Sequence, residues 1–302
     1  MINWLKNHWL LADGALFRQL RVVPDSLVLT EHGRIWLHNW KGLLQIRLRF
    51  QKKRLPAGKP YVRVHTSYRG YYHWLLESVP KLLEAQRTIS DFTLLLPASY
   101  TDTFYADTLR LLRLTAIERL QPQTMYRVPE LALPLLPEAQ GNYSAQTMRE
   151  IKTVFLAAAG VGAEAAAPAT RLYISRRKAP RRKVLNEAEV EQLLGRYGFQ
   201  CVCFEDFAFE EQLRLCASAN VLVSMHGAGL ANMIFMPEQS TVVEFRKFDD
   251  GQNYFFTQLG ETLGYQYHLQ YCPAADEQKS VQDADLYVDI AALDAVLQQL
   301  PA

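Results

Sequence analysis

The sequence predicts an α/β protein of two domains, the second of which contains a parallel β-sheet. The chain has 302 residues, which is too long for one small core and suits two domains of ordinary size. Beyond residue 170, short apolar segments alternate with amphipathic segments, as strands and helices do in a parallel sheet. A composition of 49% hydrophobic and 21% charged residues excludes a disordered or fibrous chain.

The first third of the chain predicts short strands. Residues 26–30 and 34–40 are strand-like and flank a His32-Gly33 turn, and residues 43–50 alternate apolar with basic positions. Residues 127–140 are rich in Pro and Leu, which predicts an extended crossing between the two halves.

A helix is predicted from Gly70 to Arg87, with a kink or break at Pro80, because proline lacks the backbone N–H that a helix interior uses. Its apolar face comprises Leu75, Leu76, Val79, Leu82 and Leu83. Residues 92–97 predict a buried strand, and residues 101–114 predict a helix with Thr101 as its N-cap.

The second half opens with a predicted helix from Ser144 to Ala159 that ends at Gly160. The alternation then predicts strands at 171–175, 199–204, 221–225, 241–245 and 265–271, with helices at 186–198, 209–219, 229–236 and 254–264. Parallel sheets of this kind bind ligands beyond the carboxyl ends of their strands. We therefore expect the chemistry in the loops that follow these strands.

One such loop is His226-Gly227-Ala228-Gly229, which joins a strand directly to a helix. Glycines let backbone N–H groups approach a ligand and a helix N-terminus attracts negative charge, so the loop is suited to a phosphate or diphosphate. His226 can donate to a phosphate oxygen, and Glu244, at the end of the next strand, can hold the hydroxyls of a ribose. A tight structural turn with a semi-buried histidine is the alternative.

A block of six cations follows the strand at 171–175. They are Arg176, Arg177, Lys178, Arg181, Arg182 and Lys183, in a chain whose net charge is only +2. The block is predicted at the same sheet edge as His226, where arginines can pair with phosphate oxygens. We expect one or two of these side chains to contact the ligand; the alternative is a solvated basic loop.

His73 and Glu77 are four residues apart on the predicted helix and share a face. A carboxylate beside an imidazole fixes its tautomer and raises its basicity, which suits a general base. The alternative is a histidine packed among its aromatic neighbours.

In their order along the chain, these segments resemble glycosyltransferase family 61. The segments that carry the resemblance are HWLLESVPKL (73–82), LYISRR (172–177), RRKVLNE (181–187), HGAGLANMIFMP (226–237) and VVE (242–244). The resemblance implies a GT-B architecture of two Rossmann-like domains with parallel sheets facing a cleft, and inversion at the anomeric carbon. It also implies a UDP-sugar as donor and a role in polysaccharide synthesis of the bacterial capsule or lipopolysaccharide type.

The resemblance assigns roles to named residues. Residues 1–140 would form the acceptor-side domain, 141–275 the nucleotide-sugar domain and 276–302 a strand and helix tail. The general base would be His73, oriented by Glu77. The donor would be bound by Arg176, Arg181, Arg182, Asn186, His226, Gly227, Ala228, Gly229, Leu230, Asn232 and Glu244.

No metal or other cofactor is expected. Asp283-Ala284-Asp285 matches the Asp-x-Asp pattern of metal-dependent transferases, but its position after the last strand predicts a solvated acidic turn. Arginines would replace the cation. The low net charge also argues against nucleic acid as a partner.

The expected location is the cytoplasm, because polar residues interrupt the N-terminal segment and no apolar run approaches the roughly 20 residues of a membrane span. A basic segment at 47–63 could place the protein at the inner membrane face or bind a saccharide acceptor linked to a phosphorylated lipid. A strand edge guarded by solvated cations is equally consistent with this segment.

Two other classes of function remain open. A non-catalytic nucleotide- or glycan-binding protein would keep the anion site and tolerate loss of His73. An NAD(P)-dependent oxidoreductase is disfavoured, because Asn232 stands where the dinucleotide fingerprint has its third glycine.

Overall fold

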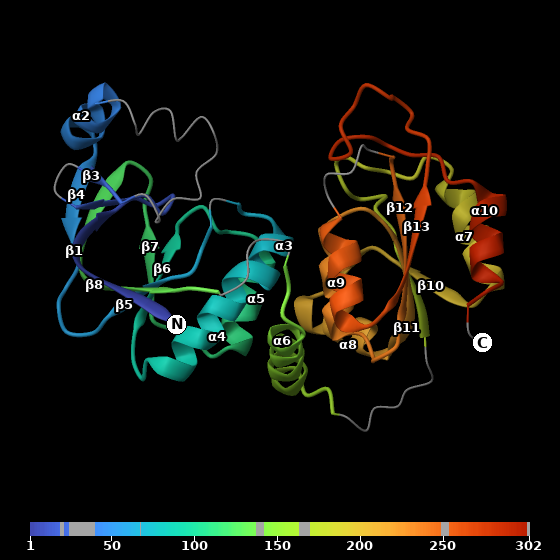
Figure 1. The fold of residues 1–302 in the computed structure, drawn as a ribbon, viewed down its shortest axis with the longest axis horizontal. Coiled ribbons are helices and arrows are strands. Elements are labelled where there is room, and N and C mark those ends of the chain that lie inside the picture. Colours follow the sequence, from blue (N-terminus) through green and yellow to red (C-terminus); the bar gives the residue numbers. More distant parts are fainter. Residues whose placement is uncertain are drawn as a thin grey trace. The chain divides into compact units, whose positions relative to one another are not determined.

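A computed structural model of the chain describes residues 1–18, 21–23, 40–66, 68–136, 142–162, 170–248 and 254–300. The chain divides into two compact units, residues 1–139 and 140–302 (Figure 1). The strand predicted at 26–30, and all but the last residue of that at 34–40, lie outside the described residues. In the part of the chain that is described, no helix is long and apolar enough to cross a membrane.

The first unit is built on a mixed sheet. Its described strands are β1 (Ile2–Leu10), β2 (Leu16–Arg18), β3 (Arg21–Val22), β4 (Gln51–Arg54), β5 (Tyr61–Arg63), β6 (Thr93–Pro97), β7 (Ile117–Leu120) and β8 (Thr124–Pro134). Their order is β3-β2-β1-β8-β5-β6-β7, with β4 also beside β8. β4 and β5 run parallel to β8, whereas β1 runs antiparallel to it. The predicted parallel pairing therefore holds for β4 to β8, whereas β1, β2 and β3 add antiparallel pairs.

β8 corrects the prediction of an extended crossing at 127–140. The strand lies between β1 on one side and β4 and β5 on the other, and its residues Val128, Leu131 and Ala132 are fully buried. A strand in the interior of a sheet often has a nearly continuous run of apolar residues. The leucines of this segment therefore belong to a core strand.

The helices of the first unit include the predicted one at 70–87. The described helical segments are α2 (Trp40–Arg49), α3 (Tyr71–His73), the π-helical turn η2 (Trp74–Ser78), α4 (Val79–Thr88) and α5 (Thr103–Leu111). Pro80 lies in the first turn of α4, where its missing N–H costs little, and the π-helical turn before it is the expected irregularity. All five residues of the predicted apolar face are buried.

Two local predictions in this unit are wrong. Residues 43–50 belong mostly to helix α2, in which Ile46 is buried and Phe50, one turn later, is partly buried against the same cluster. The alternation of apolar and basic residues in this segment predicted a strand, although the spacing of Ile46 and Phe50 is that of a helix. Asp102 rather than Thr101 precedes α5, and its side chain makes no capping hydrogen bond.

The second unit contains the predicted parallel sheet. Its strands are β9 (Thr170–Ile174), β10 (Phe199–Val202), β11 (Ala219–Met225), β12 (Thr241–Arg246) and β13 (Gln266–Tyr271), and neighbouring strands are all parallel. The order is β10-β9-β11-β12-β13. The chain therefore adds β10 on one side of β9 and the later strands on the other side. This is the order of a doubly wound sheet with one switch point.

Helices cover both faces of this sheet. They are α6 (Ala145–Ala158), α7 (Glu187–Arg196), η3 (Phe204–Asp206), α8 (Phe209–Ser218), η4 (Ala228–Phe235), α9 (Phe255–Leu263) and α10 (Ile290–Leu297). Figure 1 shows α8 and α9 on one face and α7 and α10 on the other. Three of the predicted helix ends carry glycines with positive φ, namely Gly160, Gly198 and Gly264.

The tail after β13 packs into the second unit. Leu286, Val288, Leu293 and Leu297 are buried in the same hydrophobic cluster as the sheet residues Val223 and Phe245. The tail therefore contributes side chains to this core from Ala284 onward.

Candidate functional site

The first candidate site lies at the switch point of the parallel sheet. β10 and β11 lie on opposite sides of β9, so the connections that leave β9 and β11 diverge at their carboxyl ends. Open α/β sheets bind ligands at such a point. Ser175-Arg176 directly follow β9 and His226-Gly227 directly follow β11. The basic loop and the His226 loop thus share one sheet edge, as the sequence predicted.

Arg176 and Gly227 lie against each other across this edge. A Cβ atom added to Gly227 would overlap Nη1 of Arg176 and lie 3.0 Å from its Cζ. The φ of Gly227 is 173°, extended backbone that any residue adopts, so the obstacle to a side chain here is the guanidinium of Arg176, which would have to shift. The other side of the guanidinium is held by the loop, because Nε donates to the carbonyl of Arg182 at 3.1 Å and Nη2 to that of Arg181 at 3.2 Å.

The cations of this loop are partly removed from water. Burial and then Arg181 lower the pKa of Arg176, while burial and the two neighbouring arginines lower the pKa of Arg182 to about 10. Arg182 has φ 58°, which is unusual for a residue other than glycine, and its buried Nε has no hydrogen-bond partner among the described residues. Desolvated cations beside each other are unfavourable until an anion compensates them. The loop is therefore suited to a negatively charged ligand.

His226 lies at the tip of β11 and is 5% exposed. Its Nδ1 hydrogen-bonds Oε1 of Glu244, and Oε2 of the same carboxylate accepts from the hydroxyl of Tyr267 at 2.7 Å. The carboxylate fixes the imidazole with its proton on Nδ1, so that Nε2 is left to meet a ligand.

Glu244, predicted to hold the hydroxyls of a ribose, is engaged by protein side chains in this structure. The side chain is fully buried on β12, and both of its oxygens are occupied by His226 and Tyr267. Tyr267 itself fits because Gly260 has no side chain, since a Cβ there would lie 3.2 Å from Cε2 of the tyrosine ring. Glu244 thus orients the imidazole of His226.

The short helix predicted after Gly227 is a 3₁₀-helix, η4. Ala228 and Gly229 are partly exposed at its start, whereas Leu230 and Asn232 are fully buried. The amide nitrogen of Asn232 donates to the carbonyl of Gly229 at 3.1 Å. The predicted donor contacts of Leu230 and Asn232 stay predictions, and in this structure the Asn232 side chain stabilises the loop through its hydrogen bond to Gly229.

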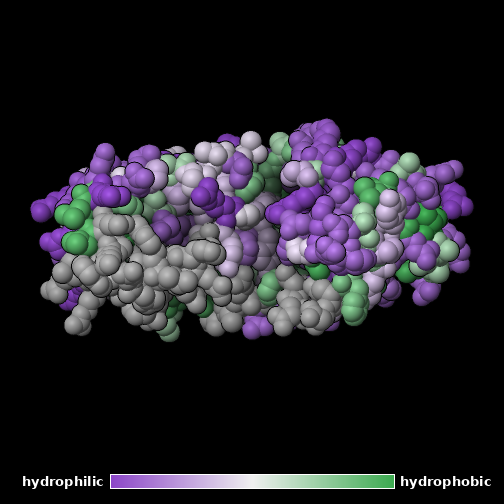
Figure 2. Space-filling view, turned by 90° about the horizontal axis from the view of Figure 1, so that it is seen from above, coloured by the Kyte–Doolittle hydropathy of each residue, from purple (hydrophilic) through white to green (hydrophobic). Residues whose placement is uncertain are grey.

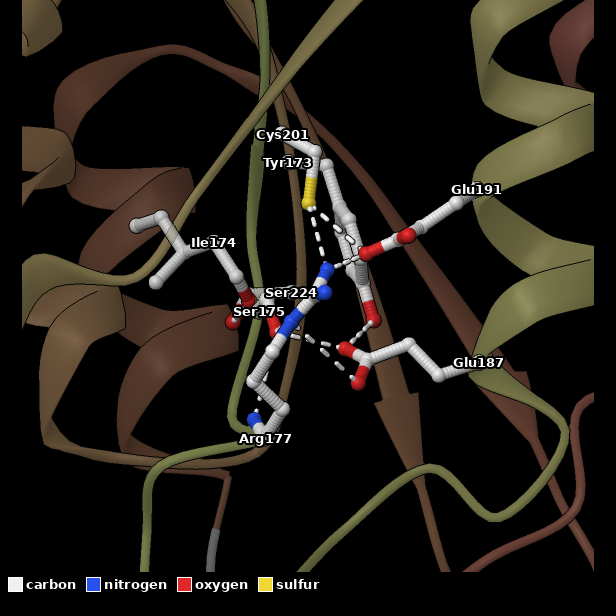
Figure 3. Close-up of polar contacts among 8 residues, drawn as sticks. All are labelled: Tyr173, Ile174, Ser175, Arg177, Glu187, Glu191, Cys201 and Ser224. Atoms are coloured by element: carbon white, nitrogen blue, oxygen red, sulfur yellow. Dashed lines mark hydrogen bonds and ion pairs between the residues drawn. The ribbon is translucent and has the colours of Figure 1, made fainter.

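Glu187 fixes the end of β9 (Figure 3). Its Oε1 accepts hydrogen bonds from the hydroxyl of Tyr173 at 2.9 Å and from that of Ser175 at 2.6 Å. Arg177 joins this group through its Nε, which donates to Oγ of Ser175 at 3.1 Å, and its guanidinium pairs with Glu191. The strand end from which Arg176 projects is thus tied to the start of α7.

Two further cations of the block pair with acidic side chains at the surface. Lys178 pairs with Asp206, and Arg181 pairs with Asp283 at 2.7 Å. Figure 2 views the molecule from above the orientation of Figure 1 and shows mostly hydrophilic residues on this surface of the second unit. Arg181 thus contributes its carbonyl to Arg176 and its side chain to the tail.

Asn186, predicted to bind donor, holds the tail. Its Nδ2 donates to the carbonyl of Val288 at 2.9 Å, and its Oδ1 accepts from the amide of the same residue at 2.9 Å. These two hydrogen bonds resemble those of a backbone pair, so Asn186 fixes the loop to the tail, and its predicted ligand contact stays a prediction.

The second candidate site lies in the first unit, on the helix that contains His73. As the spacing predicted, Nδ1 of His73 hydrogen-bonds Oε1 of Glu77, at 2.9 Å. The imidazole is stacked on the ring of Tyr68 with centroids 4.6 Å apart, and its side chain is 21% exposed. Nε2 has no hydrogen-bond partner among the described residues. The imidazole is thus oriented at one nitrogen and open at the other, as a general base requires.

Trp74 fixes the segment that carries His73. Its indole Nε1 donates to Oγ1 of Thr108 at 2.7 Å, and its side chain is 1% exposed. The helix turn of His73 is therefore anchored to α5.

No metal cluster is found in the described part of the chain, where no three His, Cys, Asp or Glu side chains are grouped to hold an ion. The carboxylates of the Asp-x-Asp triplet are engaged elsewhere: Asp283 pairs with Arg181, and Asp285 accepts from the amide of Lys183 at 2.8 Å. The predicted acidic turn is exposed at Asp283 and also contacts the basic loop.

A family model for glycosyltransferase 61 matches residues 71–243, which is more than half of the chain. The chain belongs to glycosyltransferase family 61. The matched segment begins two residues before His73 and ends at the residue before Glu244, so it includes parts of both candidate sites. The GT-B arrangement that membership of family 61 implies remains a prediction.

Several relatives match over short segments. The EGF domain-specific O-linked N-acetylglucosamine transferase of Drosophila melanogaster is 35% identical over 85 residues, which is 27% of this chain and 16% of that protein. The protein O-linked-mannose beta-1,4-N-acetylglucosaminyltransferase 2 of Pan troglodytes is 46% identical over 67 residues, 21% of this chain and 11% of that protein. The alignments thus cover less than a fifth of these relatives.

Some residues of the site escaped the sequence analysis, and part of them lie outside the family 61 match. Tyr267 and Asp285 follow the matched segment, and nothing in the spacing of the sequence links them to His226 or Lys183. Ser175 carried a weak signal, since a polar residue ended an apolar strand directly before the cations.

Proposed function

We propose that the protein is an inverting glycosyltransferase that moves a sugar from a nucleotide-sugar donor to a hydroxyl acceptor. The observation that carries the proposal is the cationic edge of the second unit, where the Arg176 guanidinium, the His226 imidazole and the start of η4 meet at the switch point. Membership of family 61 supports the same class of reaction. We propose N-acetylglucosamine as the first sugar to test, since the relatives are named as transferases of it, and UDP as its nucleotide.

The donor site would stabilise charge on the departing diphosphate. Arg176 and Arg182 would pair with phosphate oxygens, and His226, as an imidazolium with a proton on each ring nitrogen, would donate from Nε2 to the diphosphate and from Nδ1 to Glu244. Amides at Gly227, Ala228 and Gly229 would add donors from the start of η4. Removal of one such preorganised donor costs about 10²–10³ in rate in other enzymes.

The acceptor would be activated by His73. Its Nε2 takes the proton of the acceptor hydroxyl while the oxygen forms a bond to the anomeric carbon. The bond from that carbon to the diphosphate breaks, and its electron pair stays on the leaving oxygen, so the carbon inverts. Glu77 holds Nδ1 and compensates the positive charge that the ring gains.

The proposed reaction needs no metal, because the arginines supply the positive charge at the diphosphate. Activity measured after EDTA treatment should equal that of the untreated enzyme. Activity that EDTA abolishes and Mg²⁺ or Mn²⁺ restores would refute this part of the proposal.

The proposed function is tested by a thermal-shift screen with UDP, GDP, CMP, CDP, ADP and NAD⁺. A ligand of the folded state stabilises by about 2.7 kcal/mol at a hundred times its Kd. We expect one nucleoside diphosphate to raise Tm, and Arg182→Ala to remove the shift. Arg196→Ala, at the exposed end of α7, is the matched control that should keep it. A shift with NAD⁺ alone, or with none of the ligands, would reject the donor site.

Turnover separates an enzyme from a binding protein of the same fold. We expect release of UDP from UDP-N-acetylglucosamine to rise when a saccharide acceptor is added. Nucleotide binding without turnover, unaffected by His73→Ala, would favour a non-catalytic nucleotide- or glycan-binding protein.

We further propose a cytoplasmic location with peripheral attachment to an anionic membrane, where a lipid-linked saccharide of the capsule or lipopolysaccharide type would be the acceptor. Helix α2 exposes Leu48 and Leu44, by 74% and 47%, beside the exposed Arg47 and Arg49. Apolar side chains flanked by cations favour an anionic bilayer surface. Lys53 and Lys59 are less available, since they pair with Glu118 and Asp91.

Co-sedimentation with vesicles tests this attachment. Binding should increase with the fraction of phosphatidylglycerol and should fall in Leu48→Asp. Equal sedimentation with neutral and anionic vesicles would reject the membrane surface as a partner.

A further inference from the structure

The tail of the second unit crosses the basic loop and pairs with its backbone. The amide of Leu286 donates to the carbonyl of Lys183 at 2.9 Å, and the amide of Leu185 donates to the carbonyl of Leu286 at 2.8 Å. Val184 forms a parallel bridge with Leu286, and Asn186 makes its two hydrogen bonds to Val288. The last four residues of the loop, 183–186, thus lie beside tail residues 286–288.

Side chains of the tail also contact the cations of the loop. Asp285 accepts from the amide of Lys183 at 2.8 Å, Asp283 pairs with Arg181 at 2.7 Å, and Gln282 accepts from Nη1 of Arg182 at 3.2 Å. These contacts are anchored, because Ala284, Leu286 and Val288 between and after them are buried in the core.

This arrangement matters for Arg176, whose guanidinium is held by the carbonyls of Arg181 and Arg182. Those carbonyls lie in an irregular segment, and Arg182 adopts a left-handed conformation. A conformation of this kind persists only when its surroundings enforce it. The residues that follow Arg182 in the loop are held by contacts from the tail, which lies about a hundred residues later in the chain.

We propose that tail residues 282–288 complete the donor site: Asp285 positions the basic loop, and Asp283 occupies Arg181 until a diphosphate displaces it. The inference rests on the proposed function, since it assigns these residues to donor binding. Under this proposal Asp285 favours donor binding and Asp283 opposes it. Both residues lie beyond the matched family segment.

The two aspartates differ in how firmly they hold the loop. Asp283 and Arg181 are 49% and 56% exposed, and such a surface pair is weak and exchangeable. A diphosphate carries more charge and can take two hydrogen bonds from one guanidinium, so it should replace the carboxylate. Asp285 instead binds a backbone amide, which no ligand would release.

The test is the affinity of the full chain for UDP, measured by titration calorimetry. Asp285→Ala should weaken binding at least tenfold, since the loop loses its anchor, and Asp285→Asn should restore it to within about threefold, since an amide oxygen still accepts from Lys183. Asp283→Asn should tighten binding by about two- to fivefold, because a competitor for Arg181 is removed. Asp276→Asn, another exposed acid of the tail, is the matched control and should change nothing.

Hydrogen exchange gives a readout that does not depend on the ligand. Amides of residues 176–186 should exchange faster in Asp285→Ala than in the wild type, with Asp285→Asn and Asp276→Asn unchanged. Weaker binding in both Asp283→Asn and Asp285→Ala would overturn the inference, because the tail would then only stabilise the unit.

The outcomes also separate this inference from the function on which it rests. If the wild type binds UDP and all variants bind it equally, the tail has no role at the donor site, while the proposed function stands. If the wild type binds none of the nucleotides, both are refuted.

Discussion

Substitution of the two glycines that follow His226 distinguishes two explanations of this loop. The sequence explains Gly227 and Gly229 alike, as residues that let backbone amides approach a phosphate. The structure treats them differently. A Cβ at Gly227 would overlap Nη1 of Arg176, whereas a Cβ at Gly229 would lie 3.6 Å from Cγ2 of Ile174 and 3.9 Å from Cδ2 of Phe204, which are ordinary contacts.

The expected cost of Gly227→Ala follows from what must move. The guanidinium of Arg176 cannot withdraw without losing its hydrogen bonds to the carbonyls of Arg181 and Arg182. Overpacking of this kind costs about 1–3 kcal/mol of stability. A displaced guanidinium no longer meets the diphosphate, so kcat/KM should fall by about 10²–10³. Gly229→Ala should change stability by less than about 1 kcal/mol and kcat/KM by less than about threefold.

The assay is release of UDP from UDP-N-acetylglucosamine with a saccharide acceptor, together with urea denaturation of each variant. Arg176→Ala, alone and combined with Gly227→Ala, completes a double-mutant cycle. Once Arg176 is removed, the added methyl group has nothing to displace, so the double variant should be no worse than Arg176→Ala. Equal losses in Gly227→Ala and Gly229→Ala, or additive losses in the cycle, would refute the reasoning and favour amides that contact the ligand.

Three further predictions follow from the same structure. His73→Ala should lower kcat by at least about 10² with UDP affinity unchanged, and activity within a few-fold of the wild type would exclude His73 as the base. Tyr267→Phe removes one hydrogen bond to Glu244 and should raise Kd for UDP by about three- to tenfold without loss of folded protein, as calorimetry and circular dichroism would show. Burial and the nearby Arg63 lower the pKa of His65 to about 3. Below pH 6.5 the unfolded chain therefore binds a proton that the folded chain does not, and stability should fall as the pH falls. Between pH 7 and pH 5, His65 should lower the free energy of unfolding by about 2 kcal/mol. Urea denaturation of His65→Gln should therefore show a smaller pH dependence than that of the wild type.

Much of the second unit was predictable because its signals are local. Gly160, Gly198 and Gly264 each follow a helix and have positive φ, so the sequence itself marks where those helices end. The strands between them are apolar runs enclosed by helices on both faces. Local signals of this kind also placed the two loops at one edge, since parallel strands direct their carboxyl ends the same way.

The first unit was less predictable because its sheet is assembled from distant segments. β1 pairs with β8 from Ile2 opposite Pro134 to Leu10 opposite Tyr126, and nothing near either strand indicates this partner. The leucines of β8 therefore resembled a linker. In α2 the side chains at alternate positions are polar, which predicted a strand. Among the described side chains of that helix only Ile46 is deeply buried, so the alternation does not mark a buried face.

Three residues predicted to bind the donor have one feature in common. Glu244 was assigned to a ribose because it ends a strand, and Asn186 and Asn232 were assigned to the donor by the resemblance to family 61. In the structure each of them is engaged by protein, with His226, Val288 and Gly229 respectively.

A buried polar group must find a hydrogen-bond partner, and a site that positions several cations needs many such groups behind them. The residues that support a site therefore resemble, in sequence, the residues that touch its ligand. What distinguishes them is the identity of their partners, and at this site those partners are backbone atoms and side chains up to about a hundred positions away. A motif therefore locates such a site better than it assigns the role of each residue in it.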